Sequence, residues 1–486
     1  MHRRHARPRN ALPNHLAGIP ARIGKWAIWA VLACPVLAPA QALKPDQQQL
    51  RAIYQELVEI NTTDSVGDTT QATRAMAAHL RAGGFAETDL HIIVPPGAPK
   101  KGNLVARLAG NGSGKQPLLL LAHVDVVEAK REDWQRDPFK LIEENGYFYA
   151  RGASDNKAMA AVFVANLIRM KREGFVPNRD IILALTADEE IIPSKFSGVE
   201  YLLLHHRPLI DAALALNEGG AGMLDRAGKP LFHGIQVGEK VFQTYRLEVT
   251  NPGGHSARPS KDNAIYHLAE GLARLAKFDF PFKLNDTTRT YFERYAAIES
   301  GQVAADMRAI LRSPPDADAL ARLTNLPLYN PTFRTTCVAT MLEAGHATNA
   351  LPQRARAVVN CRILPGEPVG EVQKTLERVM ANDKIRITPD GAAVLSPPPP
   401  LTRDILDPVE AISARMWPGV PVIPNMLVAA TDGRFLNNAG IPTYGISGMF
   451  RDPDGGGVHG LNERLRVRSL YEGHAFLHEL VKALAR

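Results

Sequence analysis

Residues 117 to 127 read Pro-Leu-Leu-Leu-Leu-Ala-His-Val-Asp-Val-Val, and the rest of the chain is organised around them. A short apolar run rich in Leu and Val predicts a strand buried on both faces, as inside a parallel sheet. His123 and Asp125 interrupt the run at its far end. Residues i and i+2 of a strand project to the same face, so this imidazole and carboxylate are expected side by side at the sheet's carboxyl edge. Ligands bind at that edge in open α/β sheets.

A His-x-Asp pair has two interpretations. It is a core histidine satisfied by a neighbouring acid, or it is a metal-binding imidazole whose tautomer the acid fixes. The second interpretation requires further ligands downstream, and the chain contains candidates for them.

Asp155 and an acidic triplet at residues 188–190 are the first of these candidates. Asp155 stands where Gly-Ala-Ser-Asp-Asn-Lys leads into a helix expected over 158–170, a place where an Asp by itself is usually a helix N-cap. An apolar strand expected over 180–185 ends in the triplet Asp-Glu-Glu. Three successive acids at the end of a buried strand repel each other and lose hydration, so they predict either a bound cation or a solvated loop.

A third strand and a glycine-rich loop complete the set. The strand expected over 212–216 is followed by Asn217-Glu218, and His459 lies in Gly-Gly-Gly-Val-His-Gly. Two nitrogens and three carboxylates suit two Zn²⁺ ions that share a bridging carboxylate and keep a position for water. The predicted ligands are His123, Asp155, Glu190, Glu218 and His459.

The first 40 residues predict a signal peptide. Six basic residues precede an apolar segment over 26–37, and Ala38-Pro39-Ala40 has the small-x-small pattern of a signal-peptidase site. The segment is too short for a comfortable membrane span. We therefore expect export, a periplasmic location and a mature chain that starts near Gln41. The alternative is a lipoprotein cleavage box at Leu32-Ala33-Cys34, which would leave Cys34 acylated.

The leader also accounts for the net charge. It holds six of the 57 basic residues and none of the 50 acidic ones, which leaves 51 against 50 in the rest of the chain. Such a balance gives no basic surface, so nucleic acid is not an expected partner. With 45% hydrophobic and 22% charged residues, the chain is an ordinary globular protein. The 446 remaining residues exceed what one core usually holds, so two domains are expected.

Residues 237–391 differ in character from the rest. They read as a strand, a loop, an amphipathic helix, two strands and a final helix, an α+β pattern. The predicted division is a signal peptide of residues 1–40, a catalytic domain of residues 41–236 and 392–486, and an inserted domain of residues 237–391.

Cys337 and Cys361 are the only cysteines after the leader. Each lies in an alternating, strand-like run, and a turn joins the two runs. A disulfide across this hairpin is expected in an oxidising compartment, whereas two buried thiols are the alternative. Both interpretations stay open on the sequence.

The order of these motifs resembles the M20 family of metallopeptidases, which includes aminoacylase, dipeptidases and carboxypeptidases. The resemblance runs from about residue 45 to the end. It rests on five motifs in family order: His-x-Asp at 123–125, Gly-Ala-Ser-Asp-Asn-Lys at 152–157, Asp-Glu-Glu at 188–190, Asn-Glu-Gly at 217–219 and Val-His-Gly at 458–460. It implies an α/β catalytic domain with a mostly parallel sheet and an inserted α+β lid, or dimerisation, domain.

The resemblance also implies a role for each metal ligand. His123 and Glu218 would bind one zinc ion. Glu190 and His459 would bind the other, and Asp155 would bridge the pair. Co²⁺ or Mn²⁺ could replace zinc.

Further roles follow from the same resemblance. Asp125 would orient His123, and Glu189 would be the general base that takes a proton from water and later delivers it to the leaving amine. The family also has a non-proline cis peptide after the bridging acid, here Asp155-Asn156.

Four residues match family positions in or near the lid. His255, in Gly-Gly-His-Ser-Ala, matches a histidine that reaches into the neighbouring subunit and stabilises the oxyanion, which implies a homodimer; read alone it is a loop histidine. Asn349 and Arg362 match substrate-holding positions, and Arg434 matches a segment that lines the pocket. The planar fork of Arg362 suits a free carboxylate, although a structural ion pair is the alternative.

The chain departs from the family pattern twice. After Glu190 many members have glycine almost at once, whereas here residues 191–197 come first, and Val428-Ala429-Ala430 replaces small polar residues before Asp432. Both departures border the pocket, so they are expected to affect the substrate more than the chemistry.

The sequence thus predicts an exported dizinc hydrolase that cleaves an amide bond next to a free carboxylate. Its substrate would be a dipeptide, the C-terminal residue of a longer peptide, or an N-acyl amino acid. Two alternatives are a dizinc aminopeptidase, which would lack the lid insert, and a non-catalytic binding protein, which would lack the base.

Overall fold

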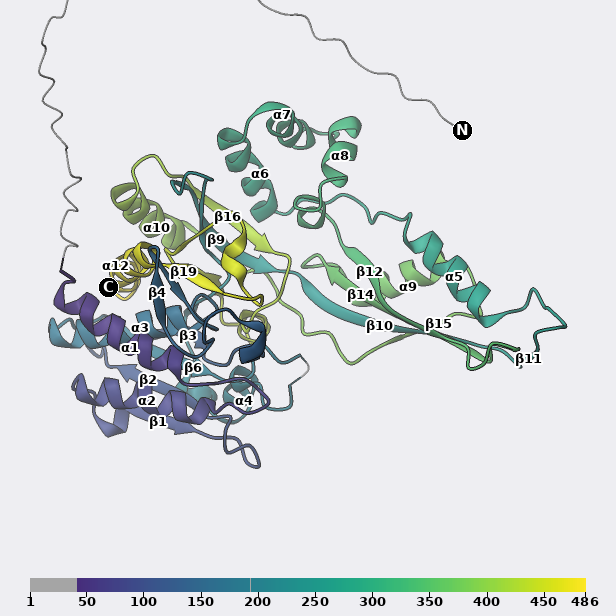
Figure 1. Ribbon diagram of the computed structural model, residues 1–486. Helices are drawn as coiled ribbons and strands as arrows, with labels where there is room; N and C mark the ends of the chain where they lie inside the picture. Colours follow the sequence, from purple (N-terminus) through teal and green to yellow (C-terminus); the bar gives the residue numbers. More distant parts are fainter. Residues whose placement is uncertain (1–41, 193) are drawn as a thin grey trace, which may run out of the picture. The chain divides into compact units, whose positions relative to one another are not determined.

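The computed structural model describes residues 42–192 and 194–486 (Figure 1). The expected signal peptide and Cys34 lie outside these residues. Within them, no helix combines the length and the apolar character needed to cross a membrane.

The largest sheet contains the strand that opens the sequence argument. Four neighbouring strands at its centre run parallel: β6 (Arg179–Thr186), β3 (Lys115–His123), β7 (Leu214–Asn217) and β17 (Thr443–Gly445). Two antiparallel strands extend one side: β2 (Asn103–Leu108) and β1 (Leu90–Ile93). The other side holds β9 (Pro230–Glu239), β8 (Gly222–Leu224), β18 (Phe450–Arg451) and β16 (Val422–Leu427).

Both faces of β3 are buried, as its composition predicts. Leu118, Leu120 and Ala122 belong to one hydrophobic core, whereas Leu119 and Leu121 belong to another. The first core packs against α1 (Pro45–Glu59), α2 (Thr69–Ala82), α3 (Lys157–Arg172), α10 (Arg403–Met416) and α12 (Val467–Leu484). The second packs against α4 (Gly198–His205) and α11 (Gly433–Asn438). Helices therefore cover both sides of the sheet, which confirms the α/β fold.

A separate antiparallel sheet lies within the residues predicted as the lid (Figure 1). Its order is β12 (Thr336–Ala344), β14 (Arg354–Ile363), β10 (Val241–Thr250) and β15 (Arg386–Pro389). Two helices, α5 (Ala264–Leu275) and α9 (Val369–Met380), pack on it and share its own hydrophobic core. Lys44–Arg486 nonetheless form one compact unit. The domain boundaries therefore stay a prediction.

Three helices between these elements were not expected. They are α6 (Asp286–Ile298), α7 (Gly301–Ile310) and α8 (Ala317–Thr324), and they enclose a small core around Phe292, Met307 and Phe333. Helix α6 also packs against β16 of the large sheet. The inserted segment is thus more helical than the pattern strand-helix-strand-strand-helix predicts.

Two smaller sheets complete the fold. One contains β4 (Ile142–Glu144), β5 (Tyr147–Tyr149) and β19 (Arg464–Arg466), and it joins the first third of the chain to its end. The other is a ribbon of β11 (Gly254–His255) and β13 (Ala350–Leu351).

The two cysteines form a disulfide. Cys337 and Cys361 stand opposite each other in β12 and β14, and their sulfur atoms are bonded. Of the two interpretations that the sequence leaves open, the structure has the cross-strand bridge.

Candidate metal centre

Three of the five predicted ligands lie at the carboxyl edge of the large sheet. His123 is the last residue of β3, and it pairs in register with Thr186, the last residue of β6. Glu190 follows β6, and Glu218 directly follows β7. Parallel strands end at the same edge, so three ligand-bearing segments are brought together by the sheet itself.

Asp155 lies between the two histidines. Its Oδ1 is 3.2 Å from Nε2 of His123, and its Oδ2 is 3.3 Å from Nε2 of His459. Each carboxylate oxygen therefore faces a different imidazole. This is the arrangement that a bridging ligand requires, because one oxygen is available to each of two cations.

The two remaining acids lie outside this bridge. Glu218 Oε2 is 3.5 Å from Nε2 of His123, and Glu190 is 3.0 Å from Nε2 of His459. Nε2 of each histidine thus faces Asp155 and one further carboxylate. Imidazole nitrogens and carboxylate oxygens in this number suit a pair of zinc-like ions, so the donor set fits the dinuclear site that the motifs predict.

The electrostatics of the cluster favour a cation. Four carboxylates, those of Asp155, Glu189, Glu190 and Glu218, surround two imidazoles. Burial opposes the charged form of His123, but Glu218 and the neighbouring aspartates raise its pKa well above the usual value. Hydrogen bonds to Asp155 and Glu190 raise the pKa of His459 to about 10. Excess buried negative charge is what divalent ions neutralise in proteins.

Glu189 has the environment of a general base. Its side chain is largely buried, and one of its oxygens lies within 4.8 Å of ligand atoms of His123 and Glu218. Burial, followed by the charge of Glu218, raises the pKa of Glu189 well above its ordinary value. A carboxylate of raised pKa can hold a proton that it has taken from water, as base catalysis requires.

Asp125 lies next to His123, as the sequence predicts, and it has further contacts that the sequence does not predict. Strand β3 ends at His123, so Asp125 lies two residues beyond the strand. The backbone oxygen of Asp125 is 3.1 Å from Nδ1 of His123, whereas its carboxylate is 3.6 Å away. That carboxylate accepts hydrogen bonds from the backbone N–H of Glu189 (3.2 Å) and Glu190 (3.0 Å). Asp125 therefore orients the base and a ligand as well as the histidine.

The first acid of the triplet is neutralised by a lysine. Lys101 Nζ lies 2.6 Å from Asp188 and 2.6 Å from Asp64, and Ser194 donates a hydrogen bond to Asp188. The three successive acids are thus divided among an ion pair, the candidate base and a candidate ligand. A solvated acidic loop is not what the structure shows.

Asp155 does not cap helix α3. The N-cap is Asn156, which makes no side-chain cap bond, while the Asp155 carboxylate faces the histidines. The peptide bond Asp155-Asn156 is cis, as the resemblance predicts.

Glu463 is a site residue that the sequence analysis missed. Its fully buried carboxylate accepts hydrogen bonds from the backbone N–H of Gly152, Ser154 and Asp155, and it forms an ion pair of 2.8 Å with Arg151. Arg151 also donates to the backbone oxygen of Gly460. These contacts join the loop that carries Asp155 to the loop that carries His459. In the sequence, the only sign of this contact is that a charged residue flanks each loop. Arg151 precedes the loop that carries Asp155, and Glu463 follows the loop that carries His459.

Arg362 and Arg434 form a second feature beside the cluster. Each guanidinium stacks on a phenyl ring, Arg362 on Phe242 and Arg434 on Phe435, with 4.6 Å to the ring centroid in both cases. Burial, and then the charge of Arg434, lowers the pKa of Arg362. Within the described residues neither arginine forms an ion pair, and Nη1 of Arg434 is buried without a hydrogen-bond partner. The pair is therefore a candidate carboxylate receptor.

The loop that carries Arg434 is anchored by Glu239. This buried acid, the last residue of β9, accepts hydrogen bonds from the backbone N–H of Thr431 (2.6 Å) and the hydroxyl of Ser396 (3.2 Å). Burial raises the pKa of Glu239 to about 7.

His255 and Asn349 lie apart from the cluster. Both are exposed, and they neighbour each other on the β11–β13 ribbon, where the Ser256 N–H donates to the Asn349 backbone oxygen. In the part of the chain that the structure describes, no hydrogen bond or ion pair links either side chain to a predicted metal ligand. Their roles stay a prediction.

Comparison with known proteins gives one family match. Residues 119–483 match the model of peptidase family M20/M25/M40. The N-fatty-acyl-amino acid synthase/hydrolase PM20D1 of Mus musculus is 29% identical over 388 residues, 77% of this chain and 75% of that protein. Aminoacylase-1A of Rattus norvegicus is 28% identical over 374 residues, covering 76% and 80%. The M20 family metallo-carboxypeptidase Sso-CP2 of Sulfolobus solfataricus shares the fold, with a TM-score of 0.67 and 19% identity over 91% of this chain and 100% of its own.

Proposed function

Because the chain belongs to peptidase family M20/M25/M40, we propose that it is a dizinc hydrolase that cleaves an amide bond next to a free carboxylate. The observation that carries this proposal is the position of Asp155, which offers one oxygen to His123 and one to His459. Glu189 lies beside this arrangement with a raised pKa. The presence of a base speaks against a binding protein without catalytic activity.

The residues divide the work as follows. His123 and Glu218 would hold one ion, Glu190 and His459 the other, and Asp155 both. When bound, such a pair lowers the pKa of water and polarises a carbonyl group. Zinc suits the nitrogen and oxygen donors, and Co²⁺ or Mn²⁺ are the alternatives.

Two steps then belong to side chains of this chain. Glu189 would take the proton of the attacking water and deliver it to the nitrogen of the leaving amine. Arg362 and Arg434 would hold the free carboxylate, because their charges lie close enough to repel each other and neither forms an ion pair within the described residues. Binding of the substrate carboxylate by these arginines would fix which amide bond of the substrate lies at the metal pair.

N-acyl amino acids are the substrate class that we favour. The names of two relatives describe hydrolases of this kind, an N-fatty-acyl-amino acid synthase/hydrolase and an aminoacylase. Cleavage of the C-terminal residue of a peptide is the second candidate, because the carboxylate receptor would serve it equally.

A substrate panel tests this function. We expect zinc-loaded protein to hydrolyse N-acyl amino acids, and we expect amidation of the substrate carboxylate to lower kcat/KM about a hundredfold or more, since the arginines then lose their counter-charge. Initial rates on matched acid and amide substrates measure the effect. Equal rates on the acid and the amide would show that the arginines do not bind the substrate carboxylate. Activity restricted to peptides with a free amino terminus would favour the aminopeptidase alternative.

We also propose that the protein acts as a homodimer in which His255 serves the partner's site. His255 and Asn349 are exposed and make no contact with the metal cluster of their own chain among the described residues. The edge strand β12 exposes Val338, Met341 and Leu342, an apolar surface that a second copy could cover.

Replacing His255 with Ala should lower kcat by about 10² to 10³, the usual effect of losing one oxyanion donor. Mixing this variant with Glu189→Gln should restore activity in heterodimers, because one of the two sites then has both an intact base and a partner histidine. Activity of the mixture above the sum of the separate variants measures complementation. No restoration at any mixing ratio would show that the site is not shared.

Export is supported by the disulfide. A cross-strand bridge between Cys337 and Cys361 is stable in oxidising compartments, which agrees with a signal peptide over residues 1–40. Mass spectrometry of the N-terminal peptide tests the processing: a start at Gln41 supports it, a lipidated Cys34 supports the lipoprotein alternative, and an intact Met1 contradicts both.

A further inference from the structure

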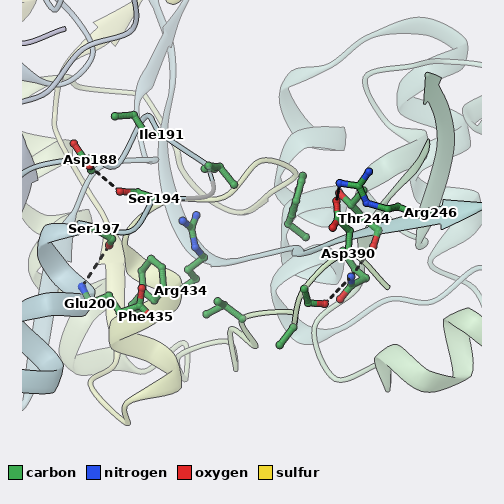
Figure 2. Close-up of a pocket in the computed structure, with 16 residues that line it drawn as sticks. Asp188, Ile191, Ser194, Ser197, Glu200, Thr244, Arg246, Asp390, Arg434 and Phe435 are labelled. Atoms are coloured by element: carbon green, nitrogen blue, oxygen red, sulfur yellow. Dashed lines mark hydrogen bonds and ion pairs between the residues drawn. The ribbon is translucent and has the colours of Figure 1, made fainter. Parts of the chain in front are cut away.

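A cavity of about 560 Å³ borders the candidate centre (Figure 2). Two of its lining residues, Asp188 and Ile191, are the immediate chain neighbours of Glu189 and Glu190. Other parts of its wall come from α4 and α11, from β10, and from residues 390–394 after β15. This volume lies within the range of sites that bind small molecules, roughly 300 to 1,000 Å³.

Five side chains of the wall are large and apolar. They are Ile191, Ile192, Phe242, Val394 and Phe435. Ile192 is 54% exposed, so it is accessible to a ligand in the cavity. Among the charged groups of the wall, Arg246 pairs with Asp390 at 2.8 Å, and Asp188 accepts a hydrogen bond from Ser194 at 2.7 Å (Figure 2). Lys101, which lies outside the wall, also neutralises Asp188. The surface left for a ligand is therefore mainly hydrocarbon.

The cavity shares its wall with the arginine pair. Phe242 and Phe435 line it, and these are the two rings on which Arg362 and Arg434 stack. Arg434 itself also lines the cavity. A carboxylate held by the guanidinium groups would thus lie next to the apolar space.

We infer that this cavity receives the side chain of the amino acid whose carboxylate Arg362 and Arg434 hold, and that the enzyme prefers large apolar amino acids. In an amino acid the carboxylate and the side chain are bonded to the same carbon, so fixing the first places the second beside the phenyl rings. The acyl chain is attached beyond the scissile bond and begins on the other side of the metal cluster. This inference rests on the proposed function.

The experiment compares two substrate series on the zinc-loaded protein. N-acetyl-phenylalanine and N-acetyl-glycine differ only in the amino-acid side chain, whereas N-octanoyl-glycine and N-acetyl-glycine differ only in the acyl chain. We expect Ile192→Asp to lower the ratio of kcat/KM for phenylalanine over glycine about tenfold or more, because a carboxylate in the wall disfavours a buried phenyl ring. The ratio for octanoyl over acetyl should stay within twofold.

Two further variants make the result specific. Val394→Asp places the same charge on another part of the wall, far in sequence from the ligand Glu190, and should lower the same ratio. Leu204→Asp on α4, where the side chain is 72% exposed outside the cavity, should leave both ratios unchanged.

The outcomes separate the inference from the function. A changed octanoyl ratio with an unchanged phenylalanine ratio would assign the cavity to the acyl chain and overturn the inference. Unchanged ratios in both Ile192→Asp and Val394→Asp would also overturn it. If the wild-type protein hydrolyses neither series, the proposed function itself fails.

Discussion

Replacing Glu189 with Gln is expected to lower kcat by about 10² to 10⁴, the usual contribution of a general base, while the protein keeps its metal. Gln preserves the size of the side chain but cannot accept a proton. Glu189 is not one of the predicted ligands, and the hydrogen bonds that Asp125 accepts here come from the backbone N–H groups of Glu189 and Glu190. The substitution should therefore leave the cluster in place.

The measurement combines turnover with metal content by elemental analysis. Glu371→Gln is the matched control, because Glu371 lies in an exposed ion pair with Lys374 on α9 and makes no contact with the cluster. A Glu189→Gln protein with two bound ions and kcat within threefold of the wild type would remove the base assignment. Loss of the ions together with activity would instead place Glu189 among the ligands.

The convergence of the metal ligands could be predicted because it follows from sheet geometry. His123, Glu190 and Glu218 each follow an apolar strand, and parallel strands end at one edge. The alternation of Leu118 to Ala122 between two cores likewise follows from a strand buried on both faces. These inferences need only the period of a strand and the position of its end.

The contacts of Asp125 could be predicted only in part. The expectation assumed that the strand continues through residue 127, whereas β3 ends at His123. The carboxylate lies 3.6 Å from His123, as expected, but it also accepts hydrogen bonds from the N–H groups of Glu189 and Glu190, which belong to another segment of the chain. Sequence periodicity cannot locate where a strand stops pairing to within a few residues.

Helices α6 to α8 show a different limit. Their apolar residues form a small core of their own, and α6 also packs against β16, which lies far away in the chain. Such a unit is stabilised by tertiary contacts, and its presence in the insert depends on a partner that local patterns do not identify.

Glu463 escaped the sequence analysis because its function depends on a contact over about 310 residues. The ion pair of Glu463 with Arg151 also leads to a second prediction with a large expected effect, on the stability of the protein. We expect Glu463→Gln to lower the free energy of unfolding by about 3 to 5 kcal/mol, because it leaves the Arg151 guanidinium buried without its counter-charge. Both side chains of this pair are almost fully buried, at 3% and 1% exposure, so water cannot replace the lost partner.

The same substitution should weaken metal binding more than a general loss of stability would. The Glu463 carboxylate fixes the N–H groups of Ser154 and Asp155, and Arg151 fixes the backbone oxygen of Gly460 next to His459. Asp155 is a predicted ligand of both ions, and His459 is a predicted ligand of one. We therefore expect the folded variant to bind both ions more weakly, with the affinity for the ion at His459 lowered about tenfold or more, measured by metal titration at a temperature where it remains folded.

Glu371→Gln again supplies the control for the chemical change. Its ion pair with Lys374 is exposed on both sides, at 70% and 64%, and water can replace either partner, so this variant should unfold like the wild type and bind both ions. Equal stability of the two variants would show that Arg151 is not held by Glu463 in solution. A destabilised Glu463→Gln that binds both ions with wild-type affinity would leave Glu463 a role in folding only, because the ligands at Asp155 and His459 would then be positioned without it.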